Sequence, residues 1–473
     1  MNVIVIGTGF VGATHAAVLA SVGHTVIAYD LNKERVSDLS SKNASRIDSA
    51  IYEPGLANLI IESKTLTFTS NFLDIAPLLD TSPIVFLCLP TPAHELTLPD
   101  EKKFLFIAAT QLSQLLKKRN EGKQTQHSLL VTKSTVPIGT ATRLKEYLEQ
   151  LGVTNFTVAS NPEFLVEGKA VEGSQKPDRI VIGVENEEDE KTLRAIYHKS
   201  DVSKIIVMQP QDAEAVKLIA NFELFSTVVR TYQVLGRLCE VTEELNFENI
   251  VRGVTTDPRI PKWGHYNSLY AGGSCFEKDA FNLLHTFNQH DGAEQSKQFV
   301  QGIIDGNNAQ LERFYNRAKE PYSLDKRKVT FDFKGKTVAL LGTAFKQDTN
   351  DVRMSPAITL AKWLIRDGVK SIRTFDPQAN ENFKKTVNDE RVVPCATAKE
   401  ALKGTDACII CTDWPEFKSL GNTIANIGKH EYLIMDGRRS LTEHYFTFMG
   451  MGMRVIAVGS PTIGPHLVFP CAK

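Results

Sequence analysis

Short β-branched runs alternate with stretches of helical periodicity through about the first 200 residues of the chain. Residues 2–6 (NVIVI) form one such run, which stops at Gly7, and apolar residues at helical spacing follow from Ala13 to Leu19. Because helical stretches separate several later runs, the pattern predicts an α/β fold with a parallel, doubly wound sheet. The further strands are expected at residues 24–30, 82–90, 128–137, 154–160 and 177–184.

The middle of the chain has a different pattern. From Asp212 to Glu244 there is one Gly and no Pro, and apolar residues recur at helical intervals, which predicts one long central helix. More helix is expected from Asp279 to about Lys319, so residues 211–325 are predicted to form an all-α connecting unit. The apolar surface of this unit fits either a dimer interface or a buried strut within the chain.

The last part of the chain repeats the first in outline. Residues 336–345 (KTVALLGTAF) resemble residues 2–10 (NVIVIGTGF), and strands are expected at 371–377, 406–412 and 431–436. The charged, Pro-containing residues 317–328 are interpreted as a linker. A second α/β domain is therefore predicted for residues 330–473.

Length and composition narrow the class of protein. At 473 residues the chain is longer than one ordinary hydrophobic core, which agrees with three units. The 54 basic and 55 acidic residues leave a net charge of −1, which gives no overall attraction to nucleic acid or anionic membrane. Seven cysteines, an odd number, fit a reducing compartment. Since the chain opens on a strand without a basic leader and has no apolar run of membrane-spanning length, we expect a soluble, cytoplasmic protein.

A glycine-rich fingerprint follows the first strand and opens the first helix. It consists of Gly7, Thr8, Gly9, Phe10, Val11 and Gly12. Glycines in this setting allow a tight turn and a close approach of the backbone to a pyrophosphate, which the helix N-terminus favours. Asp30 ends the second strand and is placed to accept hydrogen bonds from ribose hydroxyls, which favours NAD over NADP. Lys33 and Arg35 lie just beyond and keep NADP as an alternative.

Several separated motifs together resemble the UDP-glucose/GDP-mannose dehydrogenase family. They are GTGFVG (7–12), YEPGL (52–56), PTP (90–92), KSTVPIGT (133–140), NPEFLVEG (161–168), GGSCFEKD (272–279) and FKQDTNDVR (345–353). The resemblance spans nearly the whole chain and implies two Rossmann-like domains, 1–210 for NAD and 330–473 for a nucleotide sugar, joined by the central helical unit. It also implies a double oxidation of a nucleotide sugar at C6 to a uronic acid, as used in polysaccharide synthesis, and a homodimer or higher homo-oligomer.

Cys275 is the candidate nucleophile. It stands between a Gly-Gly-Ser turn and a Lys-Asp pair, and the Lys278 ammonium favours its thiolate. A thiolate can hold an aldehyde as a thiohemiacetal, which gives up a second hydride to become a thioester that water releases as the acid. The alternative is a small buried side chain with a packing role.

The other catalytic candidates come from the resemblance and from helical spacing. Lys217 and Asn221 are spaced i, i+4 on the predicted central helix and so share one face of it. By the resemblance, Lys217 is the cation that stabilises an oxyanion at C6 and Asn221 orients the reacting groups. The alternative is that both lie on a solvated helix face. Asn161 and Pro162 suit an N-cap and first helical position, so Glu163 and Glu167 are expected on one helical turn. By the resemblance Glu163 is the base for the hydrolytic water, and Thr135 and Asp279 help to place it; surface carboxylates are the alternative for both glutamates.

The resemblance also assigns binding residues. The cofactor residues are Gly7, Gly9, Phe10, Val11, Gly12, Asp30, Lys33, Pro90, Thr91, Ser134, Thr135, Glu167, Lys278 and Arg353. The substrate residues are Glu163, Phe164, Leu165, Glu167, Lys217, Asn221, Arg259, Gly272, Phe345, Lys346 and Arg438. Arg259 would reach the substrate from a neighbouring subunit, or it is a loop arginine. Lys346, Arg353 and Arg438 would neutralise the diphosphate or brace the sugar, although Arg353 can also pair with Asp351 within its loop.

No metal site is expected. Cys408 and Cys411 have half the spacing of a zinc site, but they lie in an apolar strand whose alternation points the two thiols to opposite faces. We interpret both as core residues.

The chain departs from the family pattern beside the nucleophile. Tyr270-Ala271 stands where Gly-Phe is usual, Phe222-Glu223 follows Asn221, Pro261 replaces a common Gly, and an expected Asp-Gly turn after Pro92 is missing although Asp100 is present. None of these changes removes a catalytic group, so they affect the expected substrate and loop contacts more than the expected reaction type. UDP-glucose is the favoured substrate, and GDP-mannose or a UDP-N-acetylhexosamine is the nearest alternative. A two-electron hydroxyacid dehydrogenase and a non-catalytic nucleotide-sugar binding protein stay open.

Overall fold

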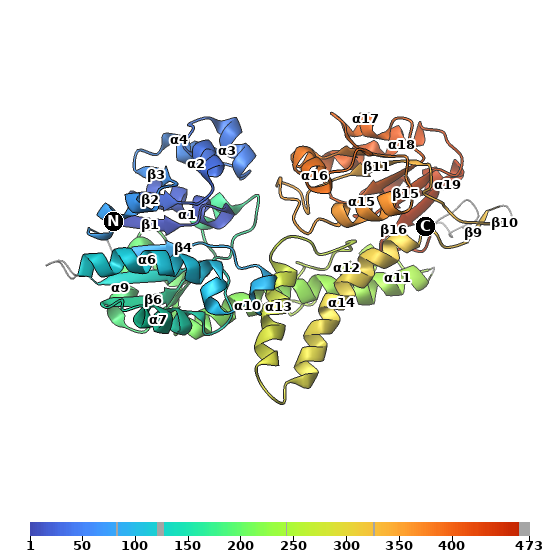
Figure 1. The fold of residues 1–473 in the computed structure, drawn as a ribbon. Helices are drawn as coiled ribbons and strands as arrows, with labels where there is room; N and C mark the ends of the chain where they lie inside the picture. The colour runs from blue at the N-terminus through green and yellow to red at the C-terminus, as the bar shows by residue number, and fades with distance from the viewer. Residues whose placement is uncertain (82–83, 121–126, 243, 325–326, 463–473) are drawn as a thin grey trace. The chain divides into compact units, whose positions relative to one another are not determined.

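The chain folds into two compact units. The computed structural model describes residues 1–473 apart from 82–83, 121–126, 243, 325–326 and 463–473 (Figure 1). The first unit comprises residues 1–221 and 278–293, and the second comprises 222–277 and 294–473.

The first unit is built on an eight-stranded sheet in the order β3-β2-β1-β4-β5-β6-β7-β8. Its neighbouring strands are parallel except β6 and β7, which meet in an antiparallel pair at Ser160 and Gly183. The strands are β1 Asn2–Ile6, β2 Thr25–Tyr29, β3 Leu66–Thr69, β4 Ile84–Leu87, β5 Ser128–Thr132, β6 Phe156–Ser160, β7 Ile180–Gly183 and β8 Ile205–Met208.

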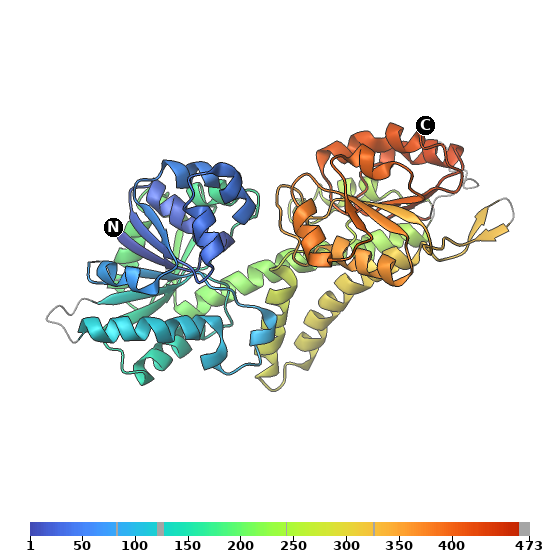
Figure 2. The same cartoon turned by 45° about the horizontal axis from the view of Figure 1, so that its top comes forward.

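Helices cover both faces of this sheet (Figures 1 and 2). Helix α1, Phe10–Ser21, and α9, Glu187–Ile196, pack against one face, where Val3 and Val5 of β1 point. Helix α6, Phe104–Asn120, and α7, Thr140–Gln150, pack against the other, with Ile4 and Ile6. The remaining helices are α2 Lys33–Leu39, α3 Ala44–Ala50, α4 Leu56–Glu62, α5 Ala76–Leu79 and α8 Ala170–Gln175. Because strands buried on both faces require continuous apolar runs, NVIVI suits β1.

The second unit contains a six-stranded parallel sheet in the order β13-β12-β11-β14-β15-β16. Its strands are β11 Thr337–Leu341, β12 Ser371–Phe375, β13 Val392–Pro394, β14 Ala407–Ile410, β15 Leu433–Asp436 and β16 Arg454–Ala457. Helices α15 and α16 contribute to the core on one face, and α17, α18 and α19 to the core on the other (Figure 2). They span Pro356–Arg366, Asn380–Val387, Ala398–Leu402, Gly421–Ala425 and Tyr445–Gly450.

The long central helix has an irregular middle. Helix α10, Pro210–Arg230, continues through a π-helical turn, Thr231–Gly236, into α11, Arg237–Val241. Three more helices follow, α12 Phe247–Val254, α13 Phe276–Asn288 and α14 Glu294–Asn316. The predicted linker contains a two-stranded antiparallel pair, β9 Tyr322–Leu324 and β10 Arg327–Val329, and residues 325–326 within it lie outside the described residues.

The predicted fold class is confirmed: each unit contains a doubly wound sheet that is parallel apart from the β6–β7 pair, and helices occupy most of the sequence between the two sheets. Every strand predicted from sequence is present, although residues 82–83 of one predicted range lie outside the described part. Among the described residues the prediction missed six strands, β3, β8, β13 and β16 in the two large sheets and the β9–β10 pair in the predicted linker. In the described part of the chain, no helix combines the length and apolar character needed to span a membrane.

Candidate active site

The glycine fingerprint forms a cradle between β1 and α1. Gly7 has a φ of 95°, and a Cβ there would lie 2.5 Å from the Cys88 carbonyl oxygen. A Cβ on Gly12 would lie 1.9 Å from the Gly7 oxygen, so both positions require glycine. Above Gly9 there is open space, and the first turn of α1 begins at Phe10. The backbone N–H groups of this turn can therefore meet an anionic diphosphate.

Asp30 lies beside this cradle at the carboxyl end of β2. Its Oδ2 accepts from the Thr8 backbone N at 2.7 Å and from Thr8 Oγ1 at 3.0 Å. Arg35, one of the two cations that kept NADP open, is 3.2 Å from the same oxygen, and Lys33 is exposed at the start of α2. Arg35 is engaged by Asp30 and is not set to bind a 2′-phosphate. The arrangement therefore fits a dinucleotide whose ribose hydroxyl faces a carboxylate, as in NAD.

Two loops after β4 and β5 meet at the same edge of the sheet. Thr91 Oγ1 donates to the Thr135 carbonyl at 2.7 Å, and Ser134 Oγ donates to the Leu89 carbonyl. Pro90 is exposed beside them. The structure therefore brings together four of the residues predicted to contact the cofactor, at the edge where parallel sheets bind ligands.

Glu163 and Lys217 form a buried ion pair in the first unit. Lys217 Nζ lies 3.2 Å from Glu163 Oε1, and the two side chains are 5% and 9% exposed. The same ammonium lies 5.3 Å from the centre of the Phe164 ring, and the second carboxylate oxygen of Glu163 accepts from the Leu165 backbone N. The solvated-face alternative for Lys217 is wrong, because this side of α10 is packed.

Asp279 joins two other predicted residues. Its carboxylate is fully buried, accepts from Asn221 Nδ2 at 2.6 Å and pairs with the Lys278 ammonium at 2.5 Å. Asn221 lies one turn after Lys217 on α10, so that helix carries partners for both carboxylates. Of the six predicted catalytic residues, Thr135, Glu163, Lys217, Asn221 and Asp279 belong to the first unit and Cys275 to the second.

The helix expected at Asn161 is absent. Residues 161–166 form a loop and 167–168 a turn, so Glu163 and Glu167 do not share a helical turn. The reason is that the Asn161 side chain has other partners: its Oδ1 accepts from Lys133 Nζ at 2.9 Å, and its Nδ2 donates to the Val181 carbonyl at 2.7 Å. It cannot also cap a helix.

Sequence reasoning missed a buried polar network behind this loop. Lys133, at the end of β5, donates to Asn161 and to the Tyr197 hydroxyl at 3.2 Å, and Tyr197 also donates to Asn161. Burial lowers the pKa of Lys133 to about 8 and raises that of the nearby Cys88 thiol to about 12. Burial also lowers the pKa of His15 on α1. Lys133 opens the KSTVPIGT motif, so its position was visible in the sequence, but its burial was not.

The Lys133 network predicts a pH dependence of stability. The unfolded lysine keeps its proton up to about pH 10.5 whereas the folded one loses it near 8, so its contribution is present above 10.5 and is lost as the pH falls to about 8. As the pH falls from about 10.5 to 8, we expect the native protein to lose about 3 kcal/mol more unfolding free energy than Lys133→Met loses. Urea unfolding across the range measures this.

The matched control for that experiment is Lys191→Met, since Lys191 is largely exposed. Lys191→Met leaves Lys133 and its neighbours Cys88, Tyr197, Glu163 and Lys217 in place, so it shows what the loss of a surface lysine alone does to the stability curve. Parallel stability curves for Lys133→Met and the native protein would rule out a buried, proton-releasing lysine.

Cys275 lies in the second unit directly before α13. Among the cysteines that the structure describes it is the exposed one, and its Sγ lies 3.8 Å from Ser274 Oγ. The glycines before it are tightly placed: a Cβ on Gly272 would lie 2.6 Å from the Met354 carbonyl oxygen, and one on Gly273, at φ 91°, would lie 2.8 Å from the Phe345 ring. The structure thus brings the predicted Gly272 and Phe345 together, and the alternative of a buried packing thiol is wrong.

The predicted cations of the second unit have different surroundings. Arg438 donates to Ser268 Oγ and to Asp413 Oδ1, both at 2.8 Å, which ties it to the loop before Cys275. Lys346 lies 5.8 Å from the centre of the Phe345 ring. Arg353 forms a two-pronged pair with Asp351 and is 61% exposed, as the loop-pair alternative describes.

Arg259 lies on the surface. Its side chain is 86% exposed and pairs with Asp257 two residues earlier. The bidentate contact holds the guanidinium within its own loop. A role across a subunit boundary stays a prediction.

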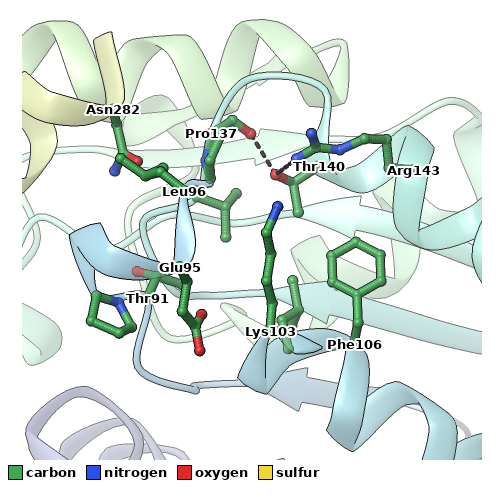
Figure 3. A pocket seen from close by; sticks show the side chains of 12 residues that line it. Thr91, Glu95, Leu96, Lys103, Phe106, Pro137, Thr140, Arg143 and Asn282 are labelled. Atoms are coloured by element: carbon green, nitrogen blue, oxygen red, sulfur yellow. Dashed lines mark hydrogen bonds between the residues drawn. The ribbon is translucent and has the colours of Figure 1, made fainter. Parts of the chain in front are cut away.

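A small pocket opens next to Thr91 in the first unit (Figure 3). Lys103, Arg143 and Asn282 are among its lining residues, and Arg143 donates to Thr140 Oγ1 at 3.1 Å. Its volume of about 30 Å³ holds about two water molecules. It is too small to hold a nucleotide sugar.

Cys408 and Cys411 belong to opposite cores, as predicted: Cys408 packs in one face of the second sheet and Cys411 in the other. Burial raises the pKa of both thiols, that of Cys408 to about 12. Within the described residues, no group of three His, Cys, Asp or Glu side chains is arranged to hold a metal ion.

Three family models match the chain. The NAD binding domain of the UDP-glucose/GDP-mannose dehydrogenase family matches residues 1–201, its central domain residues 211–309 and its UDP binding domain residues 339–443. The glycine cradle, Asp30 and the loops after β4 and β5 all lie within the NAD binding match, and Arg438 lies within the UDP binding match.

Curated relatives and solved structures match over nearly the full length. A UDP-glucose 6-dehydrogenase of Rickettsia prowazekii is 33% identical over 470 residues, covering 97% of this chain and 100% of the relative. One of Pseudomonas aeruginosa is 31% identical, with 96% and 97% covered. The structure of a UDP-glucose dehydrogenase from Pyrobaculum islandicum has a TM-score of 0.78 at 27% identity and covers 97% of this chain and 98% of its own.

Proposed function

Because the chain belongs to the UDP-glucose/GDP-mannose dehydrogenase family and uses NAD, we propose that it oxidises UDP-glucose twice at C6 to UDP-glucuronate. The main support for a double oxidation is Cys275, whose thiol is exposed at the start of a helix. The nearby Gly272 and Gly273 precede it in a loop where neither position has room for a side chain. An enzyme that stopped at the aldehyde would have no use for such a nucleophile. A cytoplasmic enzyme of this kind would supply an acidic sugar for polysaccharide synthesis.

The proposed reaction removes two hydrides from C6 in succession. The C6 alcohol loses a proton and a hydride and becomes an aldehyde. The Cys275 thiolate adds to the aldehyde carbon, and the resulting thiohemiacetal loses a second hydride to become a thioester. Water attacks the thioester carbonyl, the C–S bond breaks, and the carboxylate leaves while the thiol is restored. Bound NAD supplies the hydride acceptor, with two NAD reduced for each sugar.

The buried pair in the first unit provides the polar chemistry. Lys217 is a fixed cation for the oxyanion that develops at C6, because its ammonium is nearly excluded from water, where such a charge acts most strongly. Glu163, paired with it, receives the proton of the hydrolytic water. Thr135 and the Asn221–Asp279 pair orient these groups and the water.

The cradle and the second sheet provide binding. The glycines at 7, 9 and 12 and the carboxylate of Asp30 fit the diphosphate and ribose of NAD. Lys346 and Arg438 are the proposed contacts for the nucleotide diphosphate, since Arg438 is fixed by Asp413 and Ser268 next to the nucleophile's loop.

A homodimer through the central helix is also proposed. Four aliphatic side chains along α10, the π-helical turn and α11 are between 38% and 64% exposed, which is unusual for one stretch of helix: Leu224, Val234, Leu238 and Val241. A second copy would cover them. Arg259, exposed on its loop, would then be available to the partner's substrate.

An assay with a panel of nucleotide sugars tests the proposal. Purified protein, NAD and one sugar at a time are incubated, and NADH is counted per sugar consumed. We expect two NADH per UDP-glucose, with weaker turnover of UDP-N-acetylglucosamine and GDP-mannose, because the double oxidation passes through the thioester. A ratio of one would refute the thioester route, and a preference for another sugar would replace UDP-glucose by that substrate.

A further inference from the structure

Asn307 on α14 forms a clasp on the loop that leads to Cys275. The Ala271 backbone N donates to Asn307 Oδ1 at 2.9 Å, and Asn307 Nδ2 donates back to the Ala271 carbonyl at 3.1 Å. The asparagine is fully buried and Ala271 nearly so. One side chain therefore satisfies both backbone groups of a residue four positions before the nucleophile, as a neighbouring strand would.

The π-helical turn of the central helix holds this asparagine in place. Tyr232, also fully buried, donates from its hydroxyl to Asn307 Oδ1, and the next residue, Gln233, donates to the Gly306 carbonyl. Adjacent residues on the central helix thus both reach α14. The π-helical turn contains both donors that bond to α14 at residues 306 and 307. π-Helical turns frequently occur at functional sites, and this position agrees with that tendency.

Two further bonds fix the ends of the same loop. Gln310, one turn after Asn307 on α14, donates to the Ser268 carbonyl at 2.8 Å. At the other end, the hydroxyl of Tyr270, which lies in the loop, donates at 2.7 Å to Glu277 in the first turn of α13. Tyr270 is one of the residues that departs from the family pattern, so this chain has a tether that a glycine at position 270 would lack.

We propose that Asn307, held by Tyr232, is a positioning residue for the Cys275 thiol. This inference rests on the proposed function. Gly272, Gly273 and Ser274 separate the clasp from Cys275, and the two glycines have no side chains that could form hydrogen bonds, so the loop depends on bonds made elsewhere for its order. The clasp acts through the Ala271 backbone and touches neither sugar nor cofactor in this role.

The clasp matters most for the second half of the reaction. Formation of the aldehyde requires only a hydride acceptor and a base, whereas its capture requires the thiol within bonding distance of C6. A displaced thiol lets the aldehyde escape before the C–S bond forms. A loosened clasp should therefore change the partition between acid and released aldehyde more than it changes the first oxidation.

The experiment compares Asn307→Leu and Tyr232→Phe with Gln301→Leu, a change on the same helix whose amide donates to Asp305 on the solvent side. With UDP-glucose and NAD, a hydrazine reagent captures released aldehyde, and acid is measured separately. We expect Asn307→Leu to raise the ratio of aldehyde to acid about tenfold or more. Tyr232→Phe, which keeps the ring and removes one donor, should shift it in the same direction but less. Gln301→Leu should match the native ratio.

A second readout uses no substrate. The rate at which iodoacetamide alkylates Cys275, followed by mass spectrometry of its peptide, should slow several-fold in Asn307→Leu, because the thiolate loses its fixed position at the N-terminus of α13. Circular dichroism and thermal melting identify the variants that fold. If Asn307→Leu does not fold, the results for Tyr232→Phe decide the question.

The outcomes separate the clasp from the proposed function. If both half-reactions fall equally and alkylation is unchanged in the folded variants, Asn307 is only structural and the inference fails. If the native protein oxidises no nucleotide sugar, the proposed function fails, and the alkylation rates alone decide whether the clasp positions the thiol.

Discussion

Cys275→Ala is expected to lower acid formation at least about a thousandfold while the first oxidation continues. The thiol is exposed at the start of α13, and no other cysteine in the described part of the chain is exposed to replace it. Without a sulfur atom the aldehyde cannot be held as a thiohemiacetal, so the second hydride cannot leave. NADH formed per sugar consumed should fall from two to one, and the product should be captured as an aldehyde.

Cys395→Ala provides the control, because that thiol is buried in a core of the second sheet. It should keep the ratio of two, although its stability falls slightly. Acid formation by Cys275→Ala at the native rate would contradict the proposed role of the thiol. The assignment of the chain to its family would stand, since it rests on three domain matches.

The sequence predicted best those elements whose own residues specify them. β1, the fingerprint turn and α1 follow from an apolar run, glycines that close contacts require at positions 7 and 12, and helical periodicity, all within 21 residues. β3 was missed because only one of its four residues, the polar Thr69, is buried, so it has no apolar pattern that stands out. β16 was missed because it begins with Arg454, a buried charge whose guanidinium donates to the Ala318 carbonyl far along the chain.

The error at Asn161 has a tertiary cause. Asn-Pro-Glu is a sound local signal for the start of a helix, but the side chain that would cap it is occupied by Lys133, Tyr197 and the Val181 carbonyl. Helix α8 begins at Ala170 instead, where the buried Glu53 accepts from the Gly168 and Ala170 backbone N–H groups. A cap supplied from more than 100 residues away leaves no trace in the local sequence.

Residues of the site were easier to predict than their partners. Lys217 and Asn221 could be placed on one helix face from their spacing, and Glu163 from its motif, but their pairing with each other or with Asp279 depends on how α10 packs. Asn307 and Tyr232 gave no signal at all, because both lie within regular helical periodicity. The π-helical turn that joins them is set by packing against α14, not by a local sequence signal.

Lys217→Met is expected to lower kcat by about 100- to 1000-fold, the range for removing one fixed group that stabilises an oxyanion. The oxidation steps should slow, because each passes through charge at the C6 oxygen. The change also leaves the Glu163 carboxylate buried without its partner, so the unfolding free energy should fall by about 3–5 kcal/mol. Stopped-flow NADH formation and urea unfolding measure the two effects.

Glu163→Gln separates the chemical role of the pair from its structural one. It breaks the same ion pair, so a similar loss of stability is expected, but it removes the base for the hydrolytic water and not the cation at C6. This variant should form NADH in a burst and then stop, with a sugar-derived thioester on Cys275 detectable by mass spectrometry of the intact protein. Lys217→Met should show neither burst nor adduct. If both variants slow the same step by the same factor, the pair contributes only to stability and the separate roles assigned to its members are wrong.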